Sequence, residues 1–158
     1  MLFKYEQITE GNFNEWLEKL NDMLNEVEPP TDIDNVTEVD FDSLNMCIQE
    51  HDAIYDSLGR VYIDLLKLNR FAKRQYDLTK ANAMLSARRN RDEYPAEADR
   101  KAFAELDAEK DGDRMEGMIS LCDEVHRRRQ SIYKRMDNLI NIGHNIRAKA
   151  KTLSSGGY

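Results

Sequence analysis

The sequence predicts an all-α fold, in which an elongated antiparallel helical hairpin follows a short N-terminal helix. The chain of 158 residues is 41% hydrophobic and 34% charged, with only 7 glycines and 3 prolines, a composition that favours helices over sheet. Apolar residues recur at spacings of three and four in two long stretches. A polar connection separates these stretches, so that they can fold back on each other. The expected helices cover about 12–28, 42–88 and 113–153.

The first helix is expected to begin at Asn12, a favourable N-cap residue, with Glu15 placed for a reciprocal capping box. Apolar residues at helical spacing from Phe13 to Val27 form one face, and two consecutive prolines then end the helix. The acidic residues 29–41 show no period and are interpreted as a linker. Residues 1–41 are therefore predicted to form an acidic N-terminal helix and linker.

A heptad pattern in the second helix runs from Leu44 to Ala83 with alternating steps of four and three. A helix of about 47 residues would span about 70 Å. The interior Gly59 costs about 1 kcal/mol relative to alanine, and Asn69 is polar at a seam position. The seam members of this helix expected to form a core or oligomer interface are Leu58, Tyr62, Leu65 and Tyr76.

The connection between the long helices begins at Pro95, where a break is expected. Residues 96–110 have good helix propensity, and Asp111–Asp113 are predicted to form a turn. A second seam then runs from Met115 to Leu153 and includes a polar member, Arg129. Its members expected in the core or oligomer interface are Val125, Ile132, Met136, Leu139 and Ile146.

The hairpin body is expected to cover residues 42–153, followed by a flexible tail at 154–158. Long helices bury one stripe each, so that neighbouring copies of the chain would supply the missing burial. The sequence therefore predicts a homo-oligomer.

Charge is divided unevenly along the chain. Residues 1–58 hold 15 acidic residues and two lysines, a net charge of −13, whereas residues 59–158 hold 21 basic and 15 acidic residues, a net charge of +6. Such asymmetry suggests an acidic arm joined to a body that meets a polyanion. In the alternative interpretation, the two charged parts pair with each other within the chain or between subunits.

Neither a metal site nor a catalytic site is expected. Cys47 with His51 and Cys122 with His126 would together make a Cys2His2 ligand set, but the expected hairpin places the two pairs about 50 Å apart. The cysteines are interpreted as buried free thiols. The sequence has no nucleophile elbow and no phosphate-cradling glycine-rich loop, so we expect a non-enzymatic protein without cofactors.

We also expect the protein to be cytoplasmic. No apolar run approaches the length of a membrane span. The acidic N-terminus lacks the basic start and apolar stretch of a signal peptide.

Basic side chains gather in clusters on both long helices. In a hairpin that turns near residue 101, Arg127–Arg129 would lie opposite residues 74–76, so that two clusters converge. Such clusters bind phosphates, and Tyr76 and Tyr94 are candidates to stack on bases. In the alternative interpretation, the arginines pair with Asp and Glu, and Tyr76 is a core residue. The candidate nucleic-acid-binding residues are Lys73, Arg74, Lys80, Arg88, Arg89, Arg91, Arg127, Arg128, Lys134 and Arg135.

The order of these features resembles the phage UvsY recombination-mediator family. Residues 39–89, from VDFDSLNMCIQEH to LSARR, resemble that family's N-terminal half, in which an acidic apolar segment leads into a long helix. The run MDNLINIGHNIRAKAKTL resembles its C-terminal helix, with Gly143, Ile146 and Arg147 in the family's places. The resemblance covers about residues 36–153.

The resemblance implies a ring-forming homo-oligomer that binds single-stranded DNA, helps to remove single-strand-binding protein and loads a RecA-like recombinase, in the host cytoplasm if the chain is phage-encoded. Lys80 falls where the family carries a DNA-contacting lysine. Asn82 and Ile142 replace basic residues of the family pattern, and residues 84–87 (MLSA) replace its Tyr-Tyr-Ser-Gly run. The alternatives are a structural helical protein or DNA-packaging adaptor of a virion, or a coiled-coil interaction adaptor that does not bind nucleic acid.

Overall fold

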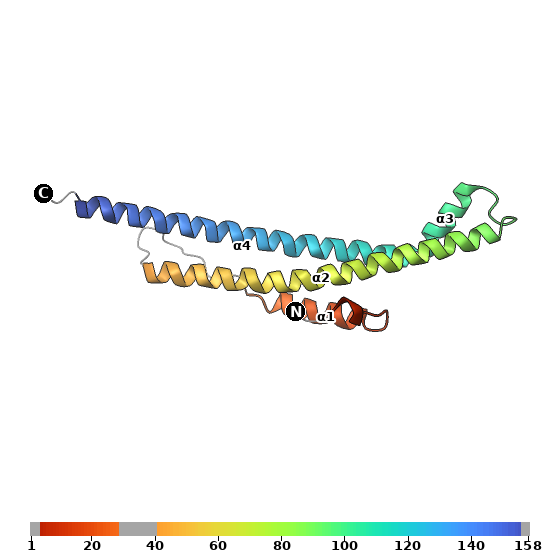
Figure 1. Ribbon diagram of the computed structural model, residues 1–158, viewed down its shortest axis with the longest axis horizontal. Coiled ribbons are helices and arrows are strands. Elements are labelled where there is room, and N and C mark those ends of the chain that lie inside the picture. Colours follow the sequence, from red (N-terminus) through yellow and green to blue (C-terminus); the bar gives the residue numbers. More distant parts are fainter. Residues whose placement is uncertain (1–3, 29–40, 156–158) are drawn as a thin grey trace. The chain divides into compact units, whose positions relative to one another are not determined.

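The computed structural model describes residues 4–28 and 41–155, with side chains up to Thr152. Regular structure in these residues is entirely helical (Figure 1). The all-α fold, with two long helices and a short N-terminal one, is thereby confirmed. The elements are the 3-10 helix η1 (Tyr5–Gln7) and the α-helices α1 (Phe13–Asn25), α2 (Phe41–Arg89), α3 (Glu97–Asp107) and α4 (Glu109–Ser155).

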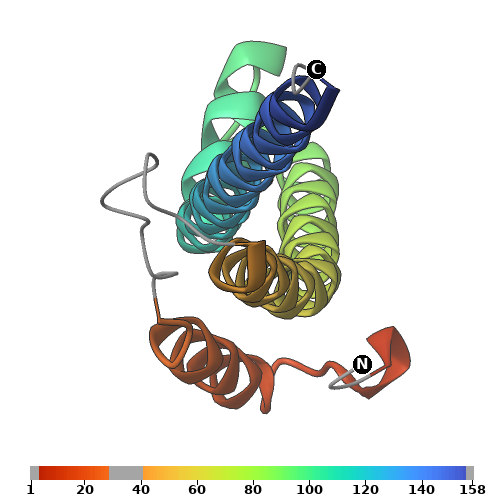
Figure 2. The ribbon, with the colours of Figure 1, turned by 90° about the vertical axis from the view of Figure 1, so that its left-hand side faces the viewer.

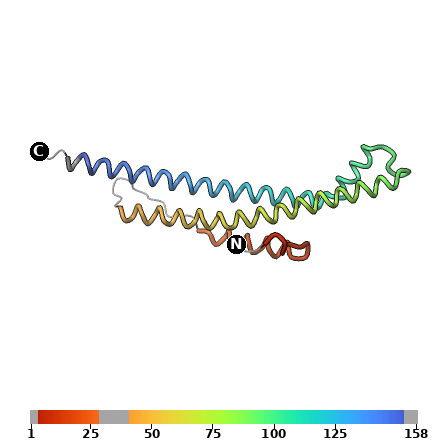
Figure 3. The backbone as a smooth tube through the Cα atoms, in the orientation of Figure 1, coloured from red at the N-terminus to blue at the C-terminus, as the bar shows by residue number. Residues whose placement is uncertain are grey.

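The chain divides into two compact units. Unit 1 combines the chain up to Asn21 with residues 62–124, and unit 2 combines residues 22–61 with the chain from Val125 onward. Helices α2 and α4, whose backbone is traced in Figure 3, each contribute residues to both units. Each unit is therefore built around its own portion of both long helices.

In unit 2, α2 and α4 lie side by side and antiparallel (Figure 2). Leu44 in α2 meets Gly143 in α4, whereas Tyr55 meets the earlier residue Tyr133. A Cβ atom on Gly143 would lie only 3.1 Å from Leu44 Cδ2, so the glycine lets the two helices approach closely. Leu44, Cys47 and Leu139 form a buried cluster at this contact.

In unit 1, the α2 and α4 segments also run antiparallel. Tyr76 packs against Gly112, and Thr79 Oγ1 donates a hydrogen bond of 2.6 Å to Asp111 Oδ2. The start of α1 covers α2, because the Phe13 and Phe71 rings stack with centroids 5.9 Å apart.

The predicted seams lie along the faces where the helices pack. Half-buried members alternate with fully buried ones, as expected where aromatic and long side chains border a narrow stripe. The fully buried seam members are Leu58, Leu65, Val125, Ile132 and Leu139, and the half-buried ones are Tyr62, Tyr76, Met136 and Ile146.

The turn predicted at Asp111–Asp113 is wrong, because α4 begins at Glu109 and includes these residues. The turn propensity of residues 111–113 is overridden by their contacts with α2. The missing side chain of Gly112 leaves room for the Tyr76 ring, whose Cε2 atom would lie 3.4 Å from a Cβ. Asp111 accepts the hydrogen bond from Thr79. The chain reverses instead through residues 90–96 and α3.

The predicted register is also wrong. Arg129 in α4 meets Tyr55 and Gly59 of α2 rather than residues 74–76. The connection between the helices is asymmetric. Helix α3 lies against α2 through a Lys80–Glu105 ion pair of 3.2 Å, and Asp111, near the start of α4, meets Thr79 rather than the end of α2. The expected convergence of Arg127–Arg129 with the basic side chains around residue 74 is therefore wrong.

The predicted capping box of α1 is not formed in the described residues. Asn12 Oδ1 accepts a hydrogen bond from the Thr9 backbone N–H at 2.7 Å, and Asn12 Nδ2 donates to the Gln7 carbonyl at 2.8 Å. The Glu15 carboxylate pairs with Lys19 at 2.7 Å. Asn12 therefore ties the helix to the preceding segment, which includes η1.

Candidate nucleic-acid interface

Exposed cations cover the part of α2 that lies in unit 1 and the residues just after it. Lys73, Arg74, Arg88, Arg89 and Arg91 are all exposed. Within residues 4–28 and 41–152, no carboxylate lies within ion-pair distance of any of them. Pairing with Asp and Glu therefore does not account for these five charges. By contrast, Lys67 on the same helix pairs with the buried Asp64.

Three arginines surround one pocket of about 450 Å³ at the end of α2, together with Pro95. Pro95 cannot continue the helical hydrogen bonding, and the chain reverses so that Arg100 of α3 comes beside Arg88 and Arg91. Arg100 Nη1 donates to the carbonyls of Tyr94 and Pro95 at 2.9 and 3.0 Å, which fixes its position. We name Arg88, Arg91 and Arg100 the arginine pocket.

The field near the arginine pocket is positive. The pKa of Glu97 is lowered, first by its hydrogen bond to Lys101 and also by the charges of Arg100 and Arg88. Glu97 is close enough for its charge to act on Arg88 and Arg100, but among the described residues no carboxylate lies within ion-pair distance of the three guanidinium groups, so a bound anion would reduce their mutual repulsion. Planar guanidinium groups match phosphate oxygens in bidentate geometry, so the arginine pocket suits a phosphate.

Lys80 differs from the other candidate cations because it already has two partners. Its Nζ lies 3.2 Å from Tyr76 Oη and 3.2 Å from Glu105 Oε1. These contacts, the tyrosine hydrogen bond first, raise the pKa of Lys80. A phosphate at Lys80 would have to compete with Glu105.

Exposed cations also cover α4 in unit 2. Arg127, Arg128, Lys134 and Arg135 are all exposed, and Lys134 has no ion pair within the part of the chain that is described. Arg128 and Arg135 border a pocket of about 320 Å³ whose walls include Ile54 and Ile132. These four cations therefore form a surface within unit 2.

Two tyrosines form an aromatic pocket beside this surface. Tyr55 of α2 and Tyr133 of α4 have ring centroids 6.1 Å apart and planes tilted by 47°. The pocket, of about 390 Å³, is completed by His126, Arg129, Gln130 and Lys134. We name it the tyrosine pocket. The sequence prediction did not include Tyr133, although its place just outside the seam and next to Lys134 was an available signal.

Gly59 explains how Arg129 fits at a seam position. The Arg129 guanidinium lies over the Tyr55 ring, with Cζ 4.4 Å from its centroid. A Cβ on Gly59 would lie 3.2 Å from Arg129 Nη2. The absence of that atom leaves room for the guanidinium, so the helix-weakening glycine and the polar seam residue belong to one arrangement.

The tyrosines that the sequence suggested for base stacking, Tyr76 and Tyr94, are half-buried against other side chains of the protein. Tyr76 packs on Gly112, and its hydroxyl oxygen accepts a hydrogen bond from Lys80 Nζ. This agrees with the alternative interpretation of Tyr76 as a packing residue. Tyr94 lies against Phe103, with ring centroids 4.8 Å apart. Among the described tyrosines, Tyr133 is the most exposed residue, at 55%, and the others are half-buried.

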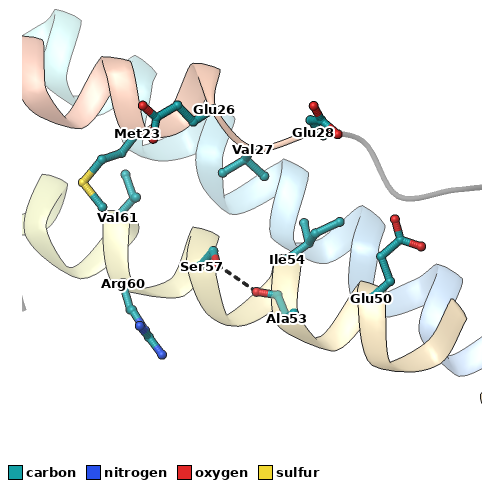
Figure 4. A pocket seen from close by; sticks show the side chains of 10 residues that line it. All are labelled: Met23, Glu26, Val27, Glu28, Glu50, Ala53, Ile54, Ser57, Arg60 and Val61. Atoms are coloured by element: carbon teal, nitrogen blue, oxygen red, sulfur yellow. Dashed lines mark hydrogen bonds between the residues drawn. The ribbon is translucent and has the colours of Figure 1, made fainter. Parts of the chain in front are cut away.

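A further pocket, of about 470 Å³, lies between the end of α1 and α2 in unit 2 (Figure 4). Its lining includes the apolar Val27 and Ile54, and three carboxylates outnumber its one cation, Arg60. The carboxylates are those of Glu26, Glu28 and Glu50. Negative charge of this density repels phosphate. The pocket is therefore unsuited to nucleic acid.

The cysteine and histidine pairs do not form a metal site within the described residues, where no group of three or more His, Cys, Asp or Glu is arranged to hold an ion. Cys47 Sγ lies 3.7 Å from His51 Nδ1, which is also 2.8 Å from the Cys47 carbonyl oxygen. Both side chains are buried.

None of the described helices is long and apolar enough to cross a membrane.

Cys122 should alkylate far more slowly than an ordinary thiol. Burial raises its pKa to about 11, so almost no thiolate is present at pH 8, and only the thiolate is nucleophilic. Iodoacetamide labelling followed by mass spectrometry should show slow reaction in buffer and fast reaction in denaturant. Equal rates in the two conditions would contradict the burial of this thiol.

Comparison with known proteins gives no relatives: no protein-family model matches the chain, and neither a curated protein nor a solved structure does.

Proposed function

We propose that the chain is a non-enzymatic, single-stranded-DNA-binding recombination mediator that assists recombinase loading. One observation carries the proposal: exposed cations on α2, just after it and on α4 have no carboxylate within ion-pair distance among the described residues. These are Lys73, Arg74, Arg88, Arg89, Arg91 and Lys134.

A phosphate backbone is the polyanion that fits such a surface. Each phosphate neutralised by a lysine or arginine releases condensed counterions, which gives affinity independent of sequence. An exposed aromatic ring beside the cations favours single strands, because unpaired bases stack on aromatic side chains. The arginine pocket and the tyrosine pocket supply these two kinds of contact.

The mediator role is supported by the resemblance to the UvsY family, which also supplies the proposed partners, a RecA-like recombinase and single-strand-binding protein. Self-association is proposed from the exposed apolar side chains. Leu78 and Leu85 lie one heptad apart on α2 at 47% and 52% exposure, and such residues on one helix face suit a second copy of the chain.

Fluorescence anisotropy with a labelled single-stranded oligonucleotide tests the proposal. We expect tight, sequence-tolerant binding whose affinity falls steeply as salt rises, because the slope of log K against log salt reports the number of phosphates contacted. Failure to bind at low salt would overturn the proposal. A structural helical protein, a DNA-packaging adaptor or a protein-interaction adaptor would then be favoured.

A mediator should also act on its partners. The recombinase should assemble faster on oligonucleotide already coated with single-strand-binding protein when this chain is added. Binding to the oligonucleotide without any such acceleration would retain the DNA-binding role and remove the mediator role.

A further inference from the structure

We infer that the tyrosine pocket binds one unpaired nucleobase of the strand, stacked on Tyr133, with the adjoining phosphate beside Lys134. This inference rests on the proposed function and adds a particular binding site to it. Nothing in the sequence pattern assigned Tyr133 or Tyr55 to nucleic acid.

The shape of the pocket suits a planar aromatic ligand. The rings of Tyr55 and Tyr133 contact each other, tilted by 47° with centroids 6.1 Å apart, and both line one pocket that is open to solvent. Its volume of about 390 Å³ falls in the range of small-molecule sites. Tyr133 is 55% exposed, which leaves much of its ring available for a base.

One wall of the pocket is held in place before any ligand arrives. Tyr55 is half-buried and carries the Arg129 guanidinium on its ring, 4.4 Å from the centroid. Gly59 provides the room for that guanidinium. A preformed wall reduces the entropy lost on binding.

Polar groups around the pocket match the remaining parts of a nucleotide. Gln130 Nε2 and His126 Nε2 lie 2.9 Å apart on successive turns of α4, and both line the pocket. An amide and an imidazole can donate to and accept from the edge of a base. Lys134 lines the same pocket without a carboxylate partner among the described residues and can neutralise a phosphate.

The site requires an unpaired base. In a duplex, each base is stacked and paired, and taking it out of the stack costs a few kcal/mol. A single strand has little of this cost, so the tyrosine pocket favours single strands over duplexes.

The experiment compares Tyr133→Ala with the wild type on a single-stranded oligonucleotide and on a matched one with abasic sites, by fluorescence anisotropy. Loss of one base stack should weaken binding about 5- to 100-fold while the salt slope stays unchanged. The wild type should bind the abasic strand more weakly, and Tyr133→Ala should bind it no worse than the wild type does. Tyr133→Phe, which keeps the ring, should retain the affinity.

Lys134→Ala should behave differently, lowering the salt slope by about 0.7 through the loss of one phosphate contact on a single strand. Ile140→Ala is the matched control, because Ile140 lies one heptad further along α4 and is 40% exposed. It should leave binding unchanged. Circular dichroism should show that all variants keep the wild-type helix content.

Two results would overturn the inference while the proposed function stands. If the wild type binds the oligonucleotide and Tyr133→Ala binds equally well, the pocket is wrong while the proposed function stands. If Tyr133→Ala weakens binding to base-containing and abasic strands alike, the ring does not act by stacking. Absence of any wild-type binding at low salt would overturn the proposed function together with the pocket.

Discussion

Replacing Leu65 by alanine should lower the free energy of unfolding by about 2–5 kcal/mol. The Leu65 side chain is 0% exposed in unit 1, and its truncation removes buried methyl groups and leaves a cavity. Urea denaturation followed by circular dichroism would measure the effect. The protein concentration should be the same for both proteins, because self-association makes stability depend on concentration.

Ile63→Ala is the matched control for this substitution. Ile63 precedes Leu65 by two residues on α2 and is 51% exposed, so its truncation creates no cavity. The expected change is within about 1 kcal/mol. Similar losses for the two variants would show that the packed face of α2 has been assigned incorrectly.

Replacing both Arg88 and Arg91 by glutamate should weaken binding of a single-stranded oligonucleotide at least about tenfold, since a hydrogen bond to a charged group contributes about 1.5–3 kcal/mol. The two arginines line the arginine pocket and have no ion pairs within the described residues. Their reversal also places carboxylates beside Arg100. The salt slope should fall by about 1.4, the value for two phosphate contacts on a single strand.

The control for net charge is the double variant Lys4→Glu and Lys19→Glu. It makes the same change of charge in the N-terminal part of unit 1, where both lysines are exposed. Anisotropy at a single salt concentration should show near-wild-type affinity for this control. An equal loss in the two double variants would mean that only overall charge matters and that the arginine pocket is not a phosphate site.

The helices could be predicted from the sequence because each long helix repeats its apolar pattern many times. The α2 boundaries, Phe41 and Arg89, lie within one residue of the expected 42–88. Heptad repetition makes such a pattern robust to single exceptions, and Gly59 and Arg129 did not disturb it. A seam of this kind specifies which face is buried, whatever partner covers it.

The pairing of the two helices could not be predicted, because a heptad pattern looks the same after a shift by whole heptads. The register depends on contacts at the connection. Two such contacts, Thr79 with Asp111 and Lys80 with Glu105, join residues that are far apart in the chain. No local sequence pattern predicts these contacts. The predicted meeting of Arg127–Arg129 with residues 74–76 failed for this reason.

The basic residues of the candidate site could be predicted from the sequence, whereas its exposed tyrosine could not. Basic residues outside the seams are expected to be solvated, and Lys73, Arg88 and Lys134 are indeed exposed. Which tyrosine is open depends on the pairing of the helices, which places Gly112 against Tyr76 and Tyr55 beside Tyr133. The pairing of the helices therefore determines which tyrosine ring is exposed.

Photo-cross-linking tests most directly whether the cations and the open tyrosine hold a single strand. A single-stranded oligonucleotide containing bromouracil would be irradiated with the protein at low salt, and the adducts would be mapped by mass spectrometry. We predict adducts at Tyr133 and in the peptides that carry Arg88 and Arg91. Adducts confined to the acidic α1 region, or no adduct at all, would contradict the proposal.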